Sequence, residues 1–265
     1  MSKRILSLLV VALLPPSVSQ ALVWEVRGKP STVTFSRGFS GLCTSCDMSN
    51  RPLDNAKLSG GNFSSSNFSG SQMRNAEMSG GNFASARFDR SDMSQSEMNG
   101  SNFATSSFVG TGLRGIEATG ANFSRSDFAG ADLTESDFVG ANLSSGRFAG
   151  TRGTSPDFSG ANLAGAMFMG ASMSEPDFTG ANMSGARFES ATITGGDFTG
   201  AILRNVRVVR SVLRGSDFSG ANLSGADFSG ATGLNASQLT DACGDENTRL
   251  PGGLTVRMCK KRRGG

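Results

Sequence analysis

The most regular feature of the chain is a five-residue spacing of large apolar side chains. Every fifth residue from Met48 to Phe228 gives 37 positions in one register, and 35 of them are Phe, Leu, Met, Ile or Val. Ala118 and Gly153 are the exceptions. The residue two positions earlier in each unit is small, mostly Ala, Ser or Gly. A period of five fits neither a helix nor an ordinary strand, so it predicts short extended segments separated by tight turns.

The repeated unit resembles the motif of a known family. Its form is Ala-(Asp/Asn)-(Leu/Phe)-x-x, and it recurs as Gly-Ala-Asn-Phe and Gly-Ala-Asp-Leu. This is similar to the motif of pentapeptide-repeat proteins, and the resemblance extends over residues 46–232. It implies an all-β fold, a right-handed quadrilateral β-helix in which four units make one coil.

The order of the central residues independently supports four units per coil. Taken in sets of four from Phe68 to Leu203, every set contains two Phe. Each layer of a solenoid must fill the same cross-section at close-packed density, so a near-constant layer volume is expected of a 20-residue coil. The column from Phe68 to Phe188, in steps of twenty, is unbroken Phe and predicts stacked rings. We therefore predict about nine coils, or roughly 45 Å at ~4.8 Å per layer.

The segments outside the repeats predict an exported protein with capped ends. Lys3 and Arg4 precede an apolar stretch too short to span a bilayer, and Ser19-Gln20-Ala21 provides small residues for a cut after Ala21. The alternative is an uncleaved interfacial anchor. We expect a periplasmic or secreted protein without a transmembrane segment. The predicted parts are a signal peptide (1–21), an N-terminal cap (22–45), the pentapeptide-repeat β-helix (46–232), a C-terminal cap with a short helix at 236–242 (233–259) and a basic disordered tail (260–265).

Four cysteines lie outside the regular repeats or at their edge: Cys43, Cys46, Cys243 and Cys259. An even count in an oxidising compartment indicates disulfides, and we predict Cys43–Cys46 and Cys243–Cys259. A single four-Cys zinc site is excluded because the two pairs would lie at opposite ends of the solenoid. The alternative is a thiol-disulfide redox role for the CxxC at Cys43 and Cys46, which would need a helix to begin after the first Cys.

The composition argues against catalysis. The chain has no His, which removes the commonest general base and the commonest metal ligand. We find no phosphate-binding loop, because the Gly-rich strings are repeat corners. The sequence therefore predicts a protein that is not an enzyme and has no cofactor and no metal centre.

The position just before each central residue should point outward, and on one side it is always acidic. At steps of twenty this column contains Glu77, Glu97, Glu117, Asp137, Asp157, Asp177, Asp197 and Asp217. On the next side the same position is Asn from Asn62 to Asn182, which fits amide ladders from coil to coil. Stacked like charges repel unless they are paired or screened. The acidic column is therefore either a feature of the repeat motif or a contact surface for a cationic protein partner or divalent cations.

A second candidate contact is one Arg-rich coil, with Ile202, Val209 and Val212 predicted to point outward. Its arginines, on different sides of the solenoid, are Arg204, Arg207, Arg210 and Arg214. Exposed apolar residues flanked by Arg are typical of interfaces. A degenerate repeat explains the coil equally well.

Three functions remain open from the sequence. The leading hypothesis is a non-enzymatic structural or protein-interaction module of the bacterial cell envelope that binds through its solenoid surface. The resemblance implies an alternative, a DNA mimic acting on a nucleic-acid enzyme such as gyrase, but export and a net charge of −4 over residues 46–232 argue against it. Nucleic acid itself is not expected as a partner. The second alternative is the CxxC redox protein. The basic tail, Lys260 to Arg263, predicts weak contact with an anionic membrane surface.

Overall fold

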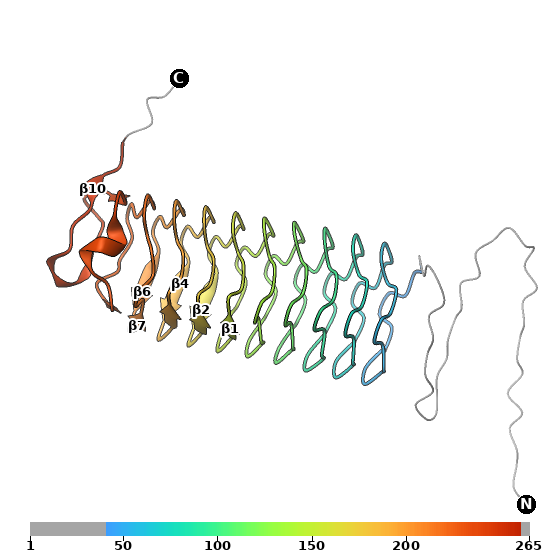
Figure 1. The fold of residues 1–265 in the computed structure, drawn as a ribbon. Coiled ribbons are helices and arrows are strands. Elements are labelled where there is room, and N and C mark those ends of the chain that lie inside the picture. The colour runs from blue at the N-terminus through green and yellow to red at the C-terminus, as the bar shows by residue number, and fades with distance from the viewer. Residues whose placement is uncertain (1–40, 261–265) are drawn as a thin grey trace, which may run out of the picture. The chain divides into compact units, whose positions relative to one another are not determined.

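The computed structural model describes residues 41–260, which wind into one solenoid (Figure 1). The predicted signal peptide, the cap up to residue 40 and the tail beyond Lys260 lie outside the described residues. Each coil takes twenty residues, because parallel bridges join residues twenty apart from Leu42↔Asn62 to Ile202↔Asn222. The all-β solenoid predicted from the repeat is confirmed.

Backbone hydrogen bonds between successive coils hold the solenoid together. The amide of each central residue donates to a carbonyl of the next coil, as from Phe63 N to Asn82 O at 2.7 Å, and Asn82 N donates back to Gly61 O at 2.8 Å. At each corner the chain turns through a residue with positive φ, two residues after the central one. A type II turn needs positive φ at its third residue, and Gly often supplies it, as at Gly60 with φ 68°.

Stacked aromatic rings fill the core. In the column from Phe68 to Phe188, rings one coil apart lie nearly parallel, and the centroids of Phe128 and Phe148 are 5.0 Å apart. The second aromatic column changes sides. It runs from Phe63 to Phe123 beneath the Asn side and from Phe138 to Phe218 beneath the acidic side. The two parts of this second column meet edge-on where it changes sides, with the ring centroids of Phe123 and Phe138 5.6 Å apart.

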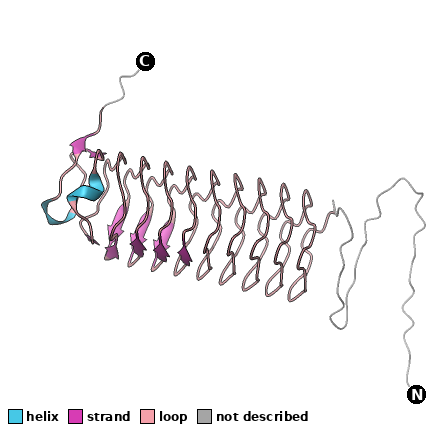
Figure 2. Cartoon of the chain, in the orientation of Figure 1, coloured by secondary structure: helices cyan, strands magenta, loops and turns pink. Residues whose placement is uncertain are grey.

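Regular strands form only in the C-terminal part of the solenoid (Figure 2). A three-stranded sheet contains β2 (Met167–Met169), β4 (Arg187–Glu189) and β6 (Arg207–Val209). A five-stranded sheet contains β1 (Arg152–Thr154), β3 (Ser172–Ser174), β5 (Thr192–Thr194), β7 (Ser211–Val212) and β8 (Ala231–Thr232). Regular strands therefore span only about four turns of the nine coils predicted from the repeat. The earlier coils pair through isolated bridges.

Proline explains part of this difference. In most coils the N–H three residues after the central residue closes the turn, as from Ala56 N to Leu53 O at 3.1 Å. Pro156 and Pro176 occupy that position after Gly153 and Met173 and have no N–H to donate. The corner opens, and β1 and β3 extend to Thr154 and Ser174. The register continues through Gly153, which pairs with Met173.

The C-terminal cap closes the last coil. The short helix is a single 3₁₀ turn, η1 (Ala236–Leu239), and not the helix to Ala242 predicted from the sequence. Thr240 leaves the helical conformation because the carbonyls of Gln238 and Thr240 accept from Phe218 N at 2.8 Å and Gly220 N at 2.9 Å. The Gln238 side chain also donates to two carbonyls of the preceding coil.

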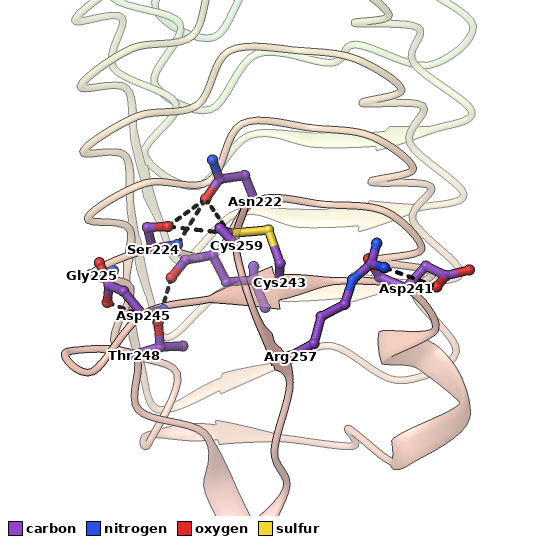
Figure 3. Close-up of a disulfide and its surroundings, with 10 residues drawn as sticks. Asn222, Ser224, Gly225, Asp241, Cys243, Asp245, Thr248, Arg257 and Cys259 are labelled. Carbon is purple, nitrogen blue, oxygen red and sulfur yellow. Dashed lines mark hydrogen bonds and ion pairs between the residues drawn. A yellow bond between two sulfur atoms is a disulfide. The ribbon is translucent and has the colours of Figure 1, made fainter. Parts of the chain in front are cut away.

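Both predicted disulfides are present. The Cys243–Cys259 bond ties β10 (Arg257–Met258) to β9 (Cys243–Gly244), which stacks on the last coil (Figure 3). A second 3₁₀ turn, η2 (Pro251–Gly253), lies between these strands. The Cys43–Cys46 bond lies at the other end of the described solenoid. No free cysteine remains within residues 41–260.

Candidate interaction surface

The coil register divides the outer surface into four faces, named here by their content. In order around the coil they are the Asn face (Asn62 and residues at steps of twenty from it), the three-stranded face (β2, β4 and β6), the five-stranded face (β1, β3, β5, β7 and β8) and the acidic face. Faces ten residues apart are opposite. The acidic face therefore lies opposite the three-stranded face.

The structure places all eight predicted carboxylates of the acidic face in one column. Parallel bridges link each of them to the next, from Glu77↔Glu97 to Asp197↔Asp217. All of them are half-buried or exposed. Between residues 77 and 220 the acidic face carries no Lys or Arg.

The Asp residues of this column have a local role that the Glu residues lack. In each of the five, Oδ1 accepts the backbone N–H of the residue two positions later, and all five distances are 2.8 Å: Val139, Ser159, Thr179, Thr199 and Ser219 are the donors. This is the Asx turn that short acidic side chains favour. A Glu carboxylate is one methylene further out. Glu77 instead pairs with Lys57 at 2.7 Å, and Glu117 accepts from the Asn99 amide at 3.5 Å.

Many carboxylates on the other faces have ion-pair partners. Six of them form ion pairs with arginine: Asp54, Asp89, Asp92, Asp127, Asp132 and Glu189. The hydrogen bond from Arg74 is the main cause that lowers the pKa of Asp54 below its ordinary value of 3.8. From Glu97 to Asp217, by contrast, no carboxylate of the acidic column has an ion-pair partner within residues 41–260. The acidic column is thus an uncompensated line of charge.

The Asn face has a structural role that needs no binding partner. Each Asn Oδ1 accepts the N–H two residues later and the side-chain amide of the next coil's Asn, as from Asn102 Nδ2 to Asn82 Oδ1 at 3.0 Å. The ladder continues to Asn182 and stops at Ile202, which is 41 % exposed. Its hydrogen bonds are satisfied within the chain, so it indicates structure and not binding.

The Arg-rich coil places its arginines on different sides of the solenoid, as predicted. Arg204 lies on the Asn face, Arg207 on the three-stranded face and Arg214 on the five-stranded face, while Arg210 stands at a corner and pairs with Glu189 at 2.8 Å. Of the three predicted outward apolar residues, Ile202 is exposed, and Val209 and Val212 are half-buried. The four arginines are therefore not brought together.

One feature of the three-stranded face escaped the sequence reasoning. Arg187 and Arg207 stack in register across β4 and β6, and neither forms an ion pair with a described residue. Met169, on the neighbouring strand of the same face, is 48 % exposed. The signal was available, because the column at steps of twenty through residue 187 contains Arg87, Arg147, Arg187 and Arg207.

The described residues do not supply the parts that the metal and redox hypotheses need. Within residues 41–260 no three His, Cys, Asp or Glu side chains are grouped to hold a metal ion. After Cys46 the chain forms the Asp47↔Asn67 bridge, so no helix begins at the CxxC. No helix in the described part is long and apolar enough to cross a bilayer.

Sequence models decide the family. A pentapeptide repeat region matches residues 121–198, and pentapeptide repeats match residues 53–83, 86–125 and 197–230. Together these matches cover more than half of the chain. The chain belongs to the pentapeptide-repeat family. Members of this family are generally structural or interaction modules and not enzymes.

Two solved structures are similar to this chain at low sequence identity. HetL of Nostoc sp. strain PCC 7120, involved in heterocyst differentiation regulation, is 23 % identical over 71 % of this chain and 89 % of its own, with a TM-score of 0.38. QnrB1, a plasmid-mediated fluoroquinolone resistance protein, is 17 % identical over 78 % of this chain and 94 % of its own, with a TM-score of 0.41. No curated protein sequence matches this pentapeptide-repeat chain.

Proposed function

We propose that this protein is a non-enzymatic binding module of the bacterial cell envelope whose acidic face captures a cationic protein surface. The observation that carries the proposal is the run of carboxylates without an ion-pair partner from Glu97 to Asp217, in a part of the acidic face that carries no Lys or Arg. On the other faces, six carboxylates form ion pairs with Arg, whereas none of the acidic column from Glu97 to Asp217 does so among the described residues. Like charges at one-coil spacing repel one another, and a cationic partner would remove that cost.

The place in the envelope rests on the sequence features at the two ends of the chain. The apolar stretch before Ala21 has the form of a secretory signal, and two disulfides fit an oxidising compartment. The proposal predicts a secreted or periplasmic mature protein that begins after Ala21. Mass measurement of the intact protein purified from the periplasm tests this, and an uncut N-terminus would contradict it.

A DNA mimic is the second candidate, because a rigid line of carboxylates has one feature of a nucleic-acid backbone. Duplex DNA carries one charge per about 1.7 Å of axis. The acidic column carries one per coil, or about 4.8 Å, and only on one face. The lower charge density favours a protein partner over imitation of DNA. Loss of gyrase inhibition or protection on neutralising the column would favour the mimic instead.

Site-specific photocrosslinking in the periplasm tests the leading proposal. A photoreactive residue at Thr119, exposed beside the column, should crosslink a partner, whereas one at Thr192, exposed on the five-stranded face, should not. Asp137→Asn, Asp157→Asn and Asp177→Asn, made together with the Thr119 probe, should abolish the crosslink. Asn keeps the turn hydrogen bond that Asp makes, as Asn142 shows on the Asn face, so the fold is preserved. An undiminished crosslink after neutralisation would contradict the proposal.

A further inference from the structure

The three-stranded face and the acidic face have complementary charges. On the three-stranded face, Arg187 and Arg207 lie one above the other with no ion-pair partner among the described residues. Like charges in register across a ladder are destabilising. Glu189 lies two residues from Arg187, yet it pairs with Arg210 at 2.8 Å and leaves Arg187 free. Arg207 has an acidic neighbour one coil further along the column, Asp227, so the isolated molecule offsets this cost only in part.

Apolar side chains lie beside this pair, together with the Glu189–Arg210 ion pair. Met167 and Met169 flank it on β2, and Val209 lies beside Arg207 on β6. Arg and Met are enriched at protein interfaces. The positive charge and the apolar neighbours point to an acidic partner that also makes apolar contacts.

The molecule itself carries a surface of that kind on the opposite side. In the same coils, Asp177 and Asp197 project from the acidic face, with Oδ1 bound to the N–H of Thr179 and Thr199 and with no cation nearby. The residues two positions after these carboxylates are Thr179 and Thr199, and no Lys or Arg lies on this part of the face. One oxygen of each carboxylate is left for an outside donor, and guanidinium groups bind carboxylates in this way.

The two columns also match in spacing. Both are built with one residue per coil, so both advance by about 4.8 Å. When two solenoids lie side by side, Arg187 and Arg207 of one copy can face two successive Asp residues of the other without distortion. A flexible cationic peptide has no such fixed pitch, whereas a second solenoid has it automatically.

We propose that the cationic partner of the acidic face is a second copy of this chain, which presents Arg187 and Arg207. This inference rests on the proposed function, because it names the partner of the same face. The contact joins two different faces, so it is heterologous, and each bound copy leaves one free face of each kind. Side-by-side association therefore continues beyond the dimer and weakens as salt screens the charges.

Sedimentation velocity of the purified mature protein tests the inference. At low salt the wild type should form dimers and larger species, and at 1 M NaCl it should return to the monomer. Arg187→Glu with Arg207→Glu should weaken association at least tenfold. The matched control is Arg204→Glu with Arg214→Glu, which makes the same charge change in exposed positions on the other two faces and should associate like the wild type. A wild type that stays monomeric at low salt, or an Arg187/Arg207 variant that associates normally, would overturn the inference.

A mixing experiment tests the pairing of faces independently. Asp177→Asn with Asp197→Asn removes the acidic half of the contact and keeps the turn hydrogen bonds. Neither this variant nor the Arg187→Glu, Arg207→Glu variant should associate alone. Mixed together, they should form a 1:1 dimer and nothing larger, because each retains one intact face. Absence of that dimer would count against the inference. If the wild type is monomeric while the Thr119 crosslink still depends on charge, the self-association fails and the proposed function stands.

Discussion

The coils before residue 120 and the coils after residue 136 use the same repeat in two ways. On the acidic side, the early coils combine Glu with a buried Met or Ala, as in Glu97-Met98 and Glu117-Ala118, and the late coils combine Asp with a buried Phe. The early Glu side chains make no contact with their own turn. The late Asp side chains each accept the N–H two residues on.

The comparison separates structure from function within one column. Asp is short enough to stabilise its turn, so its presence in the late coils has a local explanation. Glu has no such role, and its charge is free to act outward. Yet Asn caps the same turn equally well one face away, without repulsion between coils. The cap explains why the residue is short and polar, and it does not explain why it is charged.

The largest effect is expected where the two regions join. Phe138 contacts the rings of Phe123, Phe128 and Phe158 with centroids 5.6, 6.1 and 5.2 Å away. Phe138→Ala should lower the free energy of unfolding by about 3–5 kcal/mol, because it leaves a cavity at the junction. Phe138→Met, the residue that the early coils use in this column, should cost less than about 1.5 kcal/mol. Urea denaturation followed by far-UV circular dichroism measures both, and equal losses would show that the junction does not depend on the ring.

A second effect compares the two ends. Cys243–Cys259 closes a loop of sequence separation 16, and Cys43–Cys46 one of separation 3. Cys259→Ser should cost about 3 kcal/mol in the chain-entropy description and should free β10. Cys46→Ser should cost less. Hydrogen exchange should rise over residues 243–259 in the first variant only, since the strand pairing of β10 involves two residues. Unchanged protection there would mean that the strands hold without the bond.

A third change converts the acidic column into the Asn column. Asp157→Asn, Asp177→Asn and Asp197→Asn together should raise stability, by about 0.2–1 kcal/mol for each like-charge pair removed. The turn caps remain and new amide ladders become available. The unfolding midpoint at low salt measures the gain, which should shrink at high salt. A variant that is more stable but no longer binds would identify the charge as functional, and a loss of stability would show that the carboxylates are structural.

The smallest effect concerns the paired carboxylates of the early coils. Arg74 hydrogen-bonds Asp54 and lowers its pKa below 3.8, so this stability is present above that value and is lost as pH falls through the folded pKa. Arg74→Ala should lower the stability at pH 7 only slightly, because exposed ion pairs contribute little. The variant and the wild type should have the same unfolding midpoint near pH 2. A difference that persists there would mean that Arg74 acts through packing.

The sequence predicted much of the fold, and the reasons are local. The period of five, the two Phe in each layer and the disulfide pairs all followed from residue types and spacing. The strand lengths could not be predicted in this way. They depend on the corners that Pro156 and Pro176 leave open, and on in-register pairing that extends the same conformation to the strand of the next coil. The length of the helix that begins at Ala236 was overestimated. It ends early because the backbone N–H groups of Phe218 and Gly220 bind carbonyls of the cap, which is a tertiary contact.

For the candidate interaction surface, too, the sequence determined one part and the tertiary structure another. The sequence alone determined which residues share a column, because the register of a 20-residue coil fixes their faces. Only the tertiary structure decided which charges are satisfied: Glu189 reaches Arg210 and not Arg187, and the Asp residues bind their own turns while their outer oxygens stay free. Column membership depends on counting along a regular backbone. Pairing depends on side-chain length and distance between stacked coils, which no spacing in the sequence specifies.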